Sequence, residues 1–372
     1  MRYAGNGLQS KAYGRELMNL ETTTAVYAGN VRISYGMIIA VFAFLSSWML
    51  TFSLACSSEK GRPDQIKDMV SLQLKRTVSL LMYGAFAAAL SSLFGRLIYW
   101  YSHYEIYDGV SGAFSSFEGS FHEAGIVLGF FTAAAASSFF LGSEFVKKMI
   151  GASSVGMMLF MTLMSLVSMF NDSDRGKAVI TDIYHQRLPY SYITGISGGG
   201  TEYRTAVFFW KFLVLGIITI LSFVLFILKK TALYTYVCYF SAMALLDSAR
   251  YDASFLRSNG FVSLMQIVAG VFLLSTMITC LVLSIRKRRL HRFHLIFTLL
   301  FLIGIGLVGY MEYYVQRHGD LYVFCYTVMG CACIAMTCSI WYMHDSINKG
   351  RGRKLKVRKP TRGKSEESDE DN

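Results

Sequence analysis

Residues 120–142 read SFHEAGIVLGFFTAAAASSFFLG, a polar start followed by a long apolar run. A helix needs about 20 predominantly apolar residues to cross the hydrocarbon core of a bilayer. The run after His122 meets that requirement and is predicted to span a membrane. His122 would lie at the mouth of this span, where an ionisable ring is costly unless a partner, a water-filled cleft or a lipid headgroup meets it.

The same apolar pattern recurs along the chain. Hydrophobic residues make up 53% of the sequence and charged residues 16%, and the mean hydropathy is +0.41. These values predict an all-α fold, a polytopic helical bundle integral to a membrane. The predicted spans are residues 33–55, 78–101, 121–142, 150–170, 206–228, 232–247, 261–285, 293–314 and 321–343. The sixth is the shortest and is rich in tyrosine, and little apolar sequence remains for a soluble domain.

Lysine and arginine predict the orientation, because short cytoplasmic loops carry an excess of both. Basic residues follow the first, third, fifth, seventh and ninth spans, whereas the loop 102–120 contains neither Lys nor Arg. The N-terminus is therefore expected outside the membrane and the C-terminus in the cytoplasm. The loop 171–205 is less clear, since it carries four basic residues.

Charge and cysteine usage narrow the classes of partner. The net charge of +12 comes mostly from these loops and from the basic stretch 349–364, which is expected to lie along anionic headgroups, so no nucleic-acid partner is predicted. The acidic end, residues 366–371, is predicted to be disordered. The seven cysteines form no CxxC pair and lie mostly in or beside spans, so neither a disulfide, a metal site nor a cofactor is expected.

Ionisable residues gather at the predicted outer ends of the spans. They are Arg96, His122, Asp172, Asp174, Asp247 and Arg250. Singly, each has a simpler interpretation: Arg96 can extend to the interface, and Asp247 with Arg250 can form an ion pair at a helix end. Together they predict a polar pocket that opens toward outer-leaflet headgroups, where arginine and histidine suit a phosphate.

Several motifs resemble those of bacterial prolipoprotein diacylglyceryl transferases. Arg32–Ala40 (RISYGMIIA) resembles the opening helix of that family, Gly95–Tyr99 (GRLIY) its Gly-Arg-Leu-x-Tyr, and Ser120–Ile126 (SFHEAGI) its Ser-Phe-His-Gly-Gly-Leu-Ile. Tyr239–Asp252, which contains Asp247-Ser248-Ala249-Arg250, resembles the family segment that ends Glu-x-x-Arg-x-x-Asp, and Gln266 stands where the family usually has Gln. The resemblance covers roughly residues 31–285.

This resemblance implies a seven-span transferase-like domain over residues 31–285. A short outer segment (1–30) would precede it, and two additional helices (286–344) and a charged cytoplasmic tail (345–372) would follow. The implied reaction transfers diacylglyceryl from phosphatidylglycerol to the lipobox cysteine thiol of a preprolipoprotein, at the bacterial plasma membrane. The implied catalytic residues are His122, Arg96, Asp174 and Asp247, and the implied substrate-binding residues are Tyr35, Gly36, Tyr99, Asp172, Arg175, Arg250 and Gln266.

The chain departs from the family where the chemistry is expected. In place of the signature Gly-Arg-x-Gly-Asn-Phe-x-Asn-x-Glu, Leu166 replaces the arginine and Asp174 the glutamate, and Met243 replaces a second arginine in the sixth span. Each change of arginine removes a bidentate phosphate donor, for which Arg175 or Lys211 is a candidate substitute.

Three interpretations follow from these departures. The first is a diverged transferase, and the second is an inactive relative that binds lipid or a lipoprotein precursor or assembles with a membrane partner. The third is an unrelated transporter or channel, in which polar residues should reach the middle of the bilayer. The ionisable residues of this chain stand at the ends of the spans instead, which favours the first two.

Overall fold

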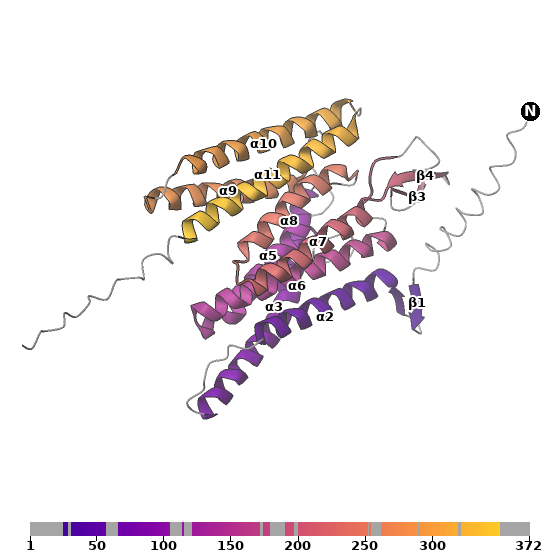
Figure 1. The fold of residues 1–372 in the computed structure, drawn as a ribbon. Coiled ribbons are helices and arrows are strands. Elements are labelled where there is room, and N and C mark those ends of the chain that lie inside the picture. Colours follow the sequence, from indigo (N-terminus) through magenta and orange to yellow (C-terminus); the bar gives the residue numbers. More distant parts are fainter. Residues whose placement is uncertain are drawn as a thin grey trace, which may run out of the picture.

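The structure of the chain is a computed structural model that describes residues 25–28, 31–56, 66–104, 114, 121–171, 174–178, 190–196, 200–251, 253, 262–288, 291–318 and 321–349. These residues fold into a bundle of long helices with two small hairpins at one end (Figure 1). The predicted all-α polytopic fold is confirmed.

Long helices account for most of the described chain. They are α2 (Tyr35–Cys56), α3 (Ile66–Ser102), α5 (Glu123–Ser138), α6 (Ser143–Asn171), α7 (Val207–Ile227), α8 (Leu233–Leu246), α9 (Leu264–Arg286), α10 (Arg292–His318) and α11 (Tyr322–Lys349). Short 3-10 helices continue two of them, η1 (Phe139–Leu141) after α5 and η3 (Asp247–Ala249) after α8. Over the described residues, 8 helices are long and apolar enough to cross a membrane, so the chain is a multi-pass membrane protein.

Helix α8 is the exception in length. Its 14 residues cover about 21 Å at 1.5 Å per residue, less than the roughly 30 Å of a bilayer core. The sixth predicted span therefore forms a helix that is too short for a full crossing by itself. It still runs from the turn after α7 toward the hairpin end of the bundle, where η3 begins (Figure 1).

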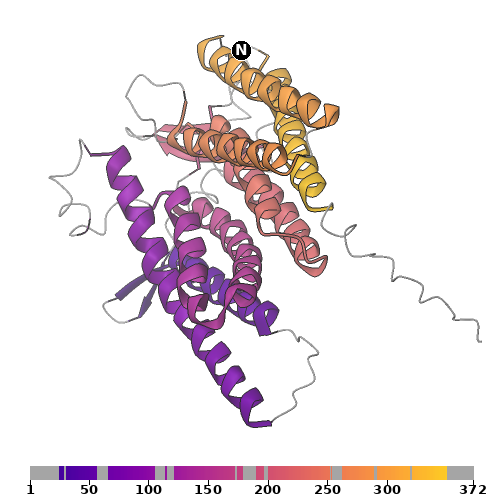
Figure 2. The ribbon, with the colours of Figure 1, turned by 90° about the vertical axis from the view of Figure 1, so that its left-hand side faces the viewer.

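Helix α3 is longer than the sequence pattern indicated. It begins at Ile66 rather than near residue 78, so Lys75 and Arg76, predicted in a loop, belong to its first turns. A helix satisfies its own backbone hydrogen bonds and can continue into the headgroup region with polar side chains. Figure 2 shows this end of α3 projecting beyond its neighbours.

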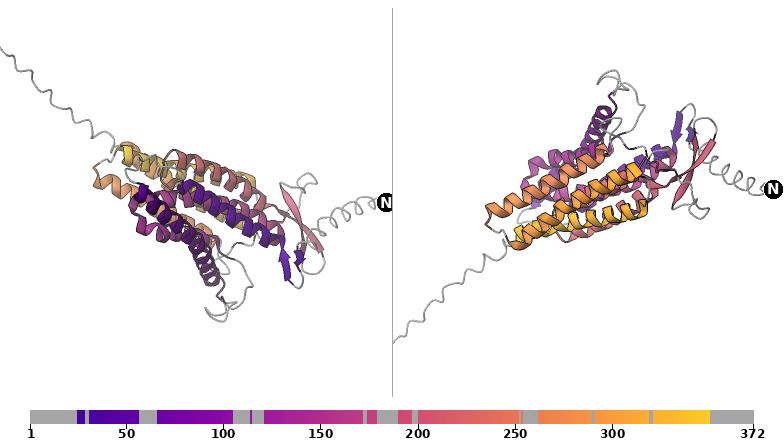
Figure 3. Two further views of the ribbon diagram at one scale, coloured as in Figure 1. Left: turned by 90° about the horizontal axis from the view of Figure 1, so that it is seen from below. Right: turned by 90° about the horizontal axis from the view of Figure 1, so that it is seen from above.

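The hairpins lie at one end of the bundle. Strand β1 (Ala25–Ala28) pairs antiparallel with β2 (Val31–Ser34), and β3 (Ser191–Ile196) pairs antiparallel with β4 (Gly200–Thr205). The loop predicted over 171–205 thus contains a hairpin. Figure 3 shows both hairpins at the end opposite the last turn of α11, and the basic turns after η1 and after α7 are at that opposite end too.

The long helices pack against one another in specific pairs. Helix α2 packs against α6, α3 against α5, and α7 against both α6 and α8. On the other side of α8, α9 and α11 cover it, and α10 packs mainly on α11 (Figure 1). Helices α2 and α3 make only slight contact with each other, which matters because both line the same cavity.

Two glycines allow α3 and α5 to approach closely. A Cβ atom at Gly125 would lie 2.3 Å from the carbonyl oxygen of Phe94, and one at Gly129 would lie 2.3 Å from the backbone nitrogen of Ser91. The close approach brings the start of α5 against α3, where the His122 backbone N–H donates to the Gly95 carbonyl at 3.0 Å. Gly125 and Gly129 therefore let α5 approach α3 closely enough to place His122 beside Gly95.

Gly129→Ala should destabilise the protein by about 1–3 kcal/mol, because the added methyl group overlaps the backbone of α3. The measurement is thermal unfolding in detergent micelles. Gly270→Ala on α9 is the matched control, since nothing lies within 4 Å of its Cβ position. Equal unfolding temperatures for the two variants would contradict the close packing of α3 on α5.

Candidate functional site

His122 caps the start of α5. Its backbone is extended, and its ring Nδ1 accepts a hydrogen bond from the Ala124 backbone N–H at 3.3 Å. The ring is 8% exposed, and burial lowers its pKa to about 4. His122 is therefore neutral at pH 7. With Nδ1 accepting, the ring proton is on Nε2, which makes that nitrogen a donor.

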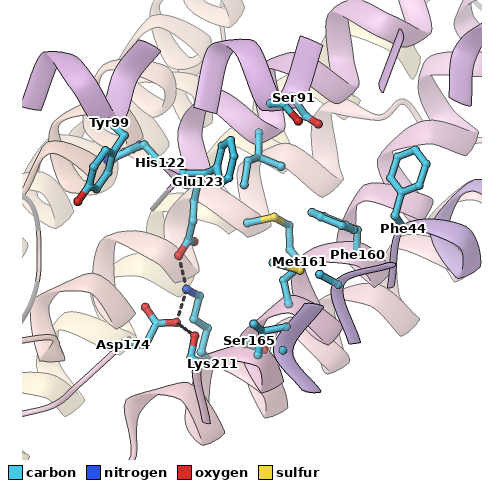
Figure 4. Close-up of a pocket in the computed structure, with 18 of the residues that line it drawn as sticks. Phe44, Ser91, Tyr99, His122, Glu123, Phe160, Met161, Ser165, Asp174 and Lys211 are labelled. Atoms are coloured by element: carbon cyan, nitrogen blue, oxygen red, sulfur yellow. Dashed lines mark hydrogen bonds and ion pairs between the residues drawn. The ribbon is translucent and has the colours of Figure 1, made fainter. Parts of the chain in front are cut away.

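Five charged side chains meet beside His122, and we call them the charge cluster: Glu123, Asp174, Lys211, Asp247 and Arg250. Lys211 Nζ lies 2.9 Å from Asp174 Oδ2 and also binds Glu123 (Figure 4). Arg250 Nε lies 3.0 Å from Asp174 Oδ1, and its Nη1 lies 3.0 Å from Asp247 Oδ1. The cluster joins α5, α7, η3 and the segment after α6.

The charged side chains of the cluster must pair with one another because they are buried. Lys211, Asp174 and Asp247 are each at most 4% exposed, and a buried charge without partners is unfavourable. Burial alone would raise the pKa of Asp174, but Arg250 and Lys211 hold it well below its usual range. The Ser168 hydroxyl donates to the same carboxylate at 2.8 Å. Asp174 is therefore ionised and can hold both cations.

A cavity of about 850 Å³ opens from the charge cluster. Its polar end is formed by the cluster together with His122 and Tyr99, and its apolar part by α2, α3 and α6, with Phe44, Phe160 and Met161 along the walls (Figure 4). Met37 and Val41 of α2 also line it while being 60% and 51% exposed. Helices α2 and α3 meet at Trp48, whose indole N–H donates to the Leu80 carbonyl at 3.0 Å. The exposed Met37 and Val41 bring the apolar part of the cavity to the outer surface of the bundle.

The pocket brings together six of the residues predicted from the sequence: Gly36, Tyr99, His122, Asp174, Asp247 and Arg250. Four others lie outside its lining, namely Tyr35, Arg96, Arg175 and Gln266. Arg96 is buried, with its guanidinium 5.7 Å from the centre of the Tyr99 ring, and Gln266 belongs to the capping box that starts α9. Asp172 is outside the described residues.

The structure also places Lys211 and Arg175, the two cations that the sequence offered as candidate phosphate donors. Lys211 is in the charge cluster, whereas Arg175 is not among the lining residues. Sequence reasoning did not single out Glu123 as a site residue. Its position directly after His122 did indicate that its side chain lies at the start of α5, because an acidic side chain in the first turn interacts favourably with the helix N-terminus.

The fold and the pocket define a class: a multi-pass helical membrane protein with a polar and apolar pocket at one end of its bundle. In the described part of the chain, no three His, Cys, Asp or Glu side chains gather as a metal site. No known family model matches the chain, and no curated protein matches it.

Lys211→Met should destabilise the protein by about 3–5 kcal/mol, because it leaves the Asp174 and Glu123 carboxylates buried without their shared cation. Unfolding in detergent with increasing denaturant measures the change. Adding Asp174→Asn should restore part of the loss. Lys147→Met is the control, since Lys147 pairs with Glu144 at an exposed position and such pairs contribute about 0–1 kcal/mol.

The lowered pKa of His122 should appear as a pH dependence of stability. The unfolded ring binds a proton near pH 6.5, but the folded ring binds one only near pH 4. The free energy of unfolding should therefore fall as the pH drops through this window, by about 3 kcal/mol in total. His122→Asn keeps an oxygen that can cap α5 but does not titrate. Parallel profiles for the two proteins between pH 6.5 and 4 would contradict a buried, neutral His122.

Proposed function

We propose that this protein binds a membrane phospholipid in the pocket and transfers its diacylglyceryl group to a cysteine thiol. The observation that carries the proposal is the two-part cavity, in which an apolar space open to the bilayer ends at buried charges and His122. A phospholipid has the same two parts, and a headgroup and an acyl chain need different surroundings.

The position of the pocket supports a lipid rather than a water-soluble ligand. Its polar end lies at the ends of the helices, where headgroups would be, and its apolar part lies beside the exposed residues Met37 and Val41. An acyl chain could pass beside these two residues without leaving an apolar environment. The distribution of lysine and arginine predicts that this end faces the outer leaflet, and the resemblance to the transferases implies a bacterial plasma membrane.

The chemistry follows from the resemblance to the diacylglyceryl transferases. A bond forms between the thiol sulfur and the glycerol carbon of phosphatidylglycerol, the bond from that carbon to the phosphate oxygen breaks, and glycerol phosphate leaves. The reaction needs donors for the departing phosphate and an acceptor for the thiol proton.

The pocket contains groups of both kinds. His122 Nε2–H and the two cations are donors, and neutral histidine can serve as a donor to developing negative charge. Glu123 Oε2 is buried beside the Tyr239 hydroxyl and makes no hydrogen bond of good geometry within the described chain, so Glu123 is our candidate acceptor for the thiol proton. Lys211 and Arg250 supply the positive charge that Leu166 and Met243 do not.

A second candidate is an inactive relative that binds lipid without transferring it. The observation that favours it is the pairing of both cations with carboxylates: Lys211 with Glu123 and Asp174, and Arg250 with Asp174 and Asp247. A phosphate would have to compete with these carboxylates for its donors. Binding then needs less rearrangement than catalysis.

The two candidates can be separated in one strain and one binding assay. The strain is depleted of its own transferase and expresses this chain, and the assay measures phosphatidylglycerol retained by the purified protein. A transferase should restore growth, and His122→Ala should abolish the rescue while leaving the protein inserted in the membrane. Lys230→Gln, at the opposite end of the bundle, should leave rescue unchanged.

Each other outcome has a defined meaning. Wild-type protein that inserts correctly and binds phosphatidylglycerol without rescuing growth would support the inactive relative. If the purified protein retained no more phosphatidylglycerol than an unrelated membrane protein of similar size, both candidates would be contradicted. Rescue that survives both His122→Ala and Glu123→Gln would exclude the proposed roles of these side chains.

A further inference from the structure

Glu312 lies outside the pocket on α10, yet it is a buried carboxylate. It is 2% exposed, and over the described residues its oxygens accept hydrogen bonds only from side-chain amides. Gln266 Nε2 donates to Oε2 at 3.1 Å, and Gln316 Nε2 donates to Oε1 at 3.0 Å. Burying an ionisable group in a membrane helix costs free energy, so a structural role for the Glu312 carboxylate is expected.

From Glu312, hydrogen bonds continue to the charge cluster. They pass in order through Glu312, Gln266, Ser263, Asp247 and Arg250. The Gln266 backbone N–H donates to Ser263 Oγ at 3.1 Å, and that hydroxyl in turn donates to Asp247 Oδ2. The other oxygen of Asp247 accepts from Arg250 Nη1 at 3.0 Å. The chain of bonds thus crosses from α10 through α9 to η3.

Geometry leaves Gln266 one orientation. The Ser263 backbone N–H can only donate, and it does so to Gln266 Oε1 at 2.9 Å. The amide nitrogen of Gln266 must therefore point the other way, where its two hydrogens go to the Ala244 carbonyl at 3.2 Å and to Glu312. Without an acceptor at position 312, one buried N–H would be left unsatisfied.

Helix α11 makes a second link to the same place. The Tyr326 hydroxyl donates to the Ser248 carbonyl at 3.2 Å, and Ser248 follows Asp247 in η3. Helix α11 thus contacts η3, which carries Asp247, directly, whereas α10 reaches η3 through Gln266 and Ser263 at the start of α9. Helix α8 ends directly before η3, so the hydrogen bond from Tyr326 to Ser248 also holds the C-terminal end of α8 in place.

We infer that Glu312 is a positioning residue for the pocket: it fixes Gln266, which with Ser263 holds Asp247 and so keeps the Arg250 guanidinium at the polar end. The two C-terminal helices are then part of the machinery that shapes the pocket. The hydrogen bond from Gln266 needs an acceptor at position 312, so Glu312→Gln should preserve it, with the exposed Gln316 amide turned to offer its oxygen. The charge interaction of Glu312 with Lys177 is lost in this variant but is not part of the chain of bonds.

The test measures how readily Arg250 reacts with an arginine-specific dicarbonyl reagent in the purified full-length protein, read by mass spectrometry of its peptides. Arg76 is the internal reference, because it is partly buried like Arg250 and its guanidinium lies 5.7 Å from the centre of the Phe145 ring, at the opposite end of the bundle from the chain of bonds. Glu312→Leu should speed modification of Arg250 on the order of fivefold, as expected for one lost hydrogen bond, and leave Arg76 unchanged.

Matched variants separate positioning from general loosening. Glu312→Gln and Gln316→Leu should both react like the wild-type protein. Gln266→Met should speed modification of Arg250 as Glu312→Leu does, and it replaces Glu312→Leu if that variant does not fold. Combining the two substitutions should give no further acceleration, because each one alone breaks the link. Unchanged Arg250 reactivity in Glu312→Leu and Gln266→Met, or equal acceleration at Arg250 and Arg76, would overturn the inference. No lipid is used, so the result is independent of the proposed function.

Discussion

The ammonium group of Lys211, held between Glu123 and Asp174, is the interaction on which the pocket depends. It connects α7 to the start of α5 and to the segment after α6, three elements that the sequence keeps far apart. Asp174 extends the contact to Arg250 and so to η3. Because none of these charges can be buried alone, the elements must meet together, and the polar end of the pocket is the result.

The rest of the bundle gives this cluster an apolar neighbour. Helix α5 is held against α3 through Gly125 and Gly129, while α2 is held against α6 and meets α3 at Trp48. The cavity that begins at the buried charges ends beside the exposed apolar side chains of Met37 and Val41. This combination of a charged and an apolar end is the basis for proposing an amphiphilic ligand.

Much of the fold was predictable because apolar length is a local property. Each predicted span corresponds to a helix, and the deviations have physical causes: α3 continues past the hydrocarbon core with polar residues, and α8 is too short to cross. Within the site, His122, Asp174, Asp247 and Arg250 were predictable from charge at span ends. Ser168 and Ser263 were not, since their contacts lie across helices and serine is common in spans, and Glu123 was indicated only by its place directly after His122.

The sequence by itself determined the membrane class, the helical fold and the level at which ionisable residues gather, because these follow from the order of apolar and polar residues along one chain. Only the tertiary structure decided which charges pair. It made Lys211 the cation shared by two carboxylates, left Arg96 and Arg175 outside the pocket lining, and joined Glu312 to Asp247 across three helices. Such contacts depend on crossing angles and close backbone approaches, which no local pattern specifies.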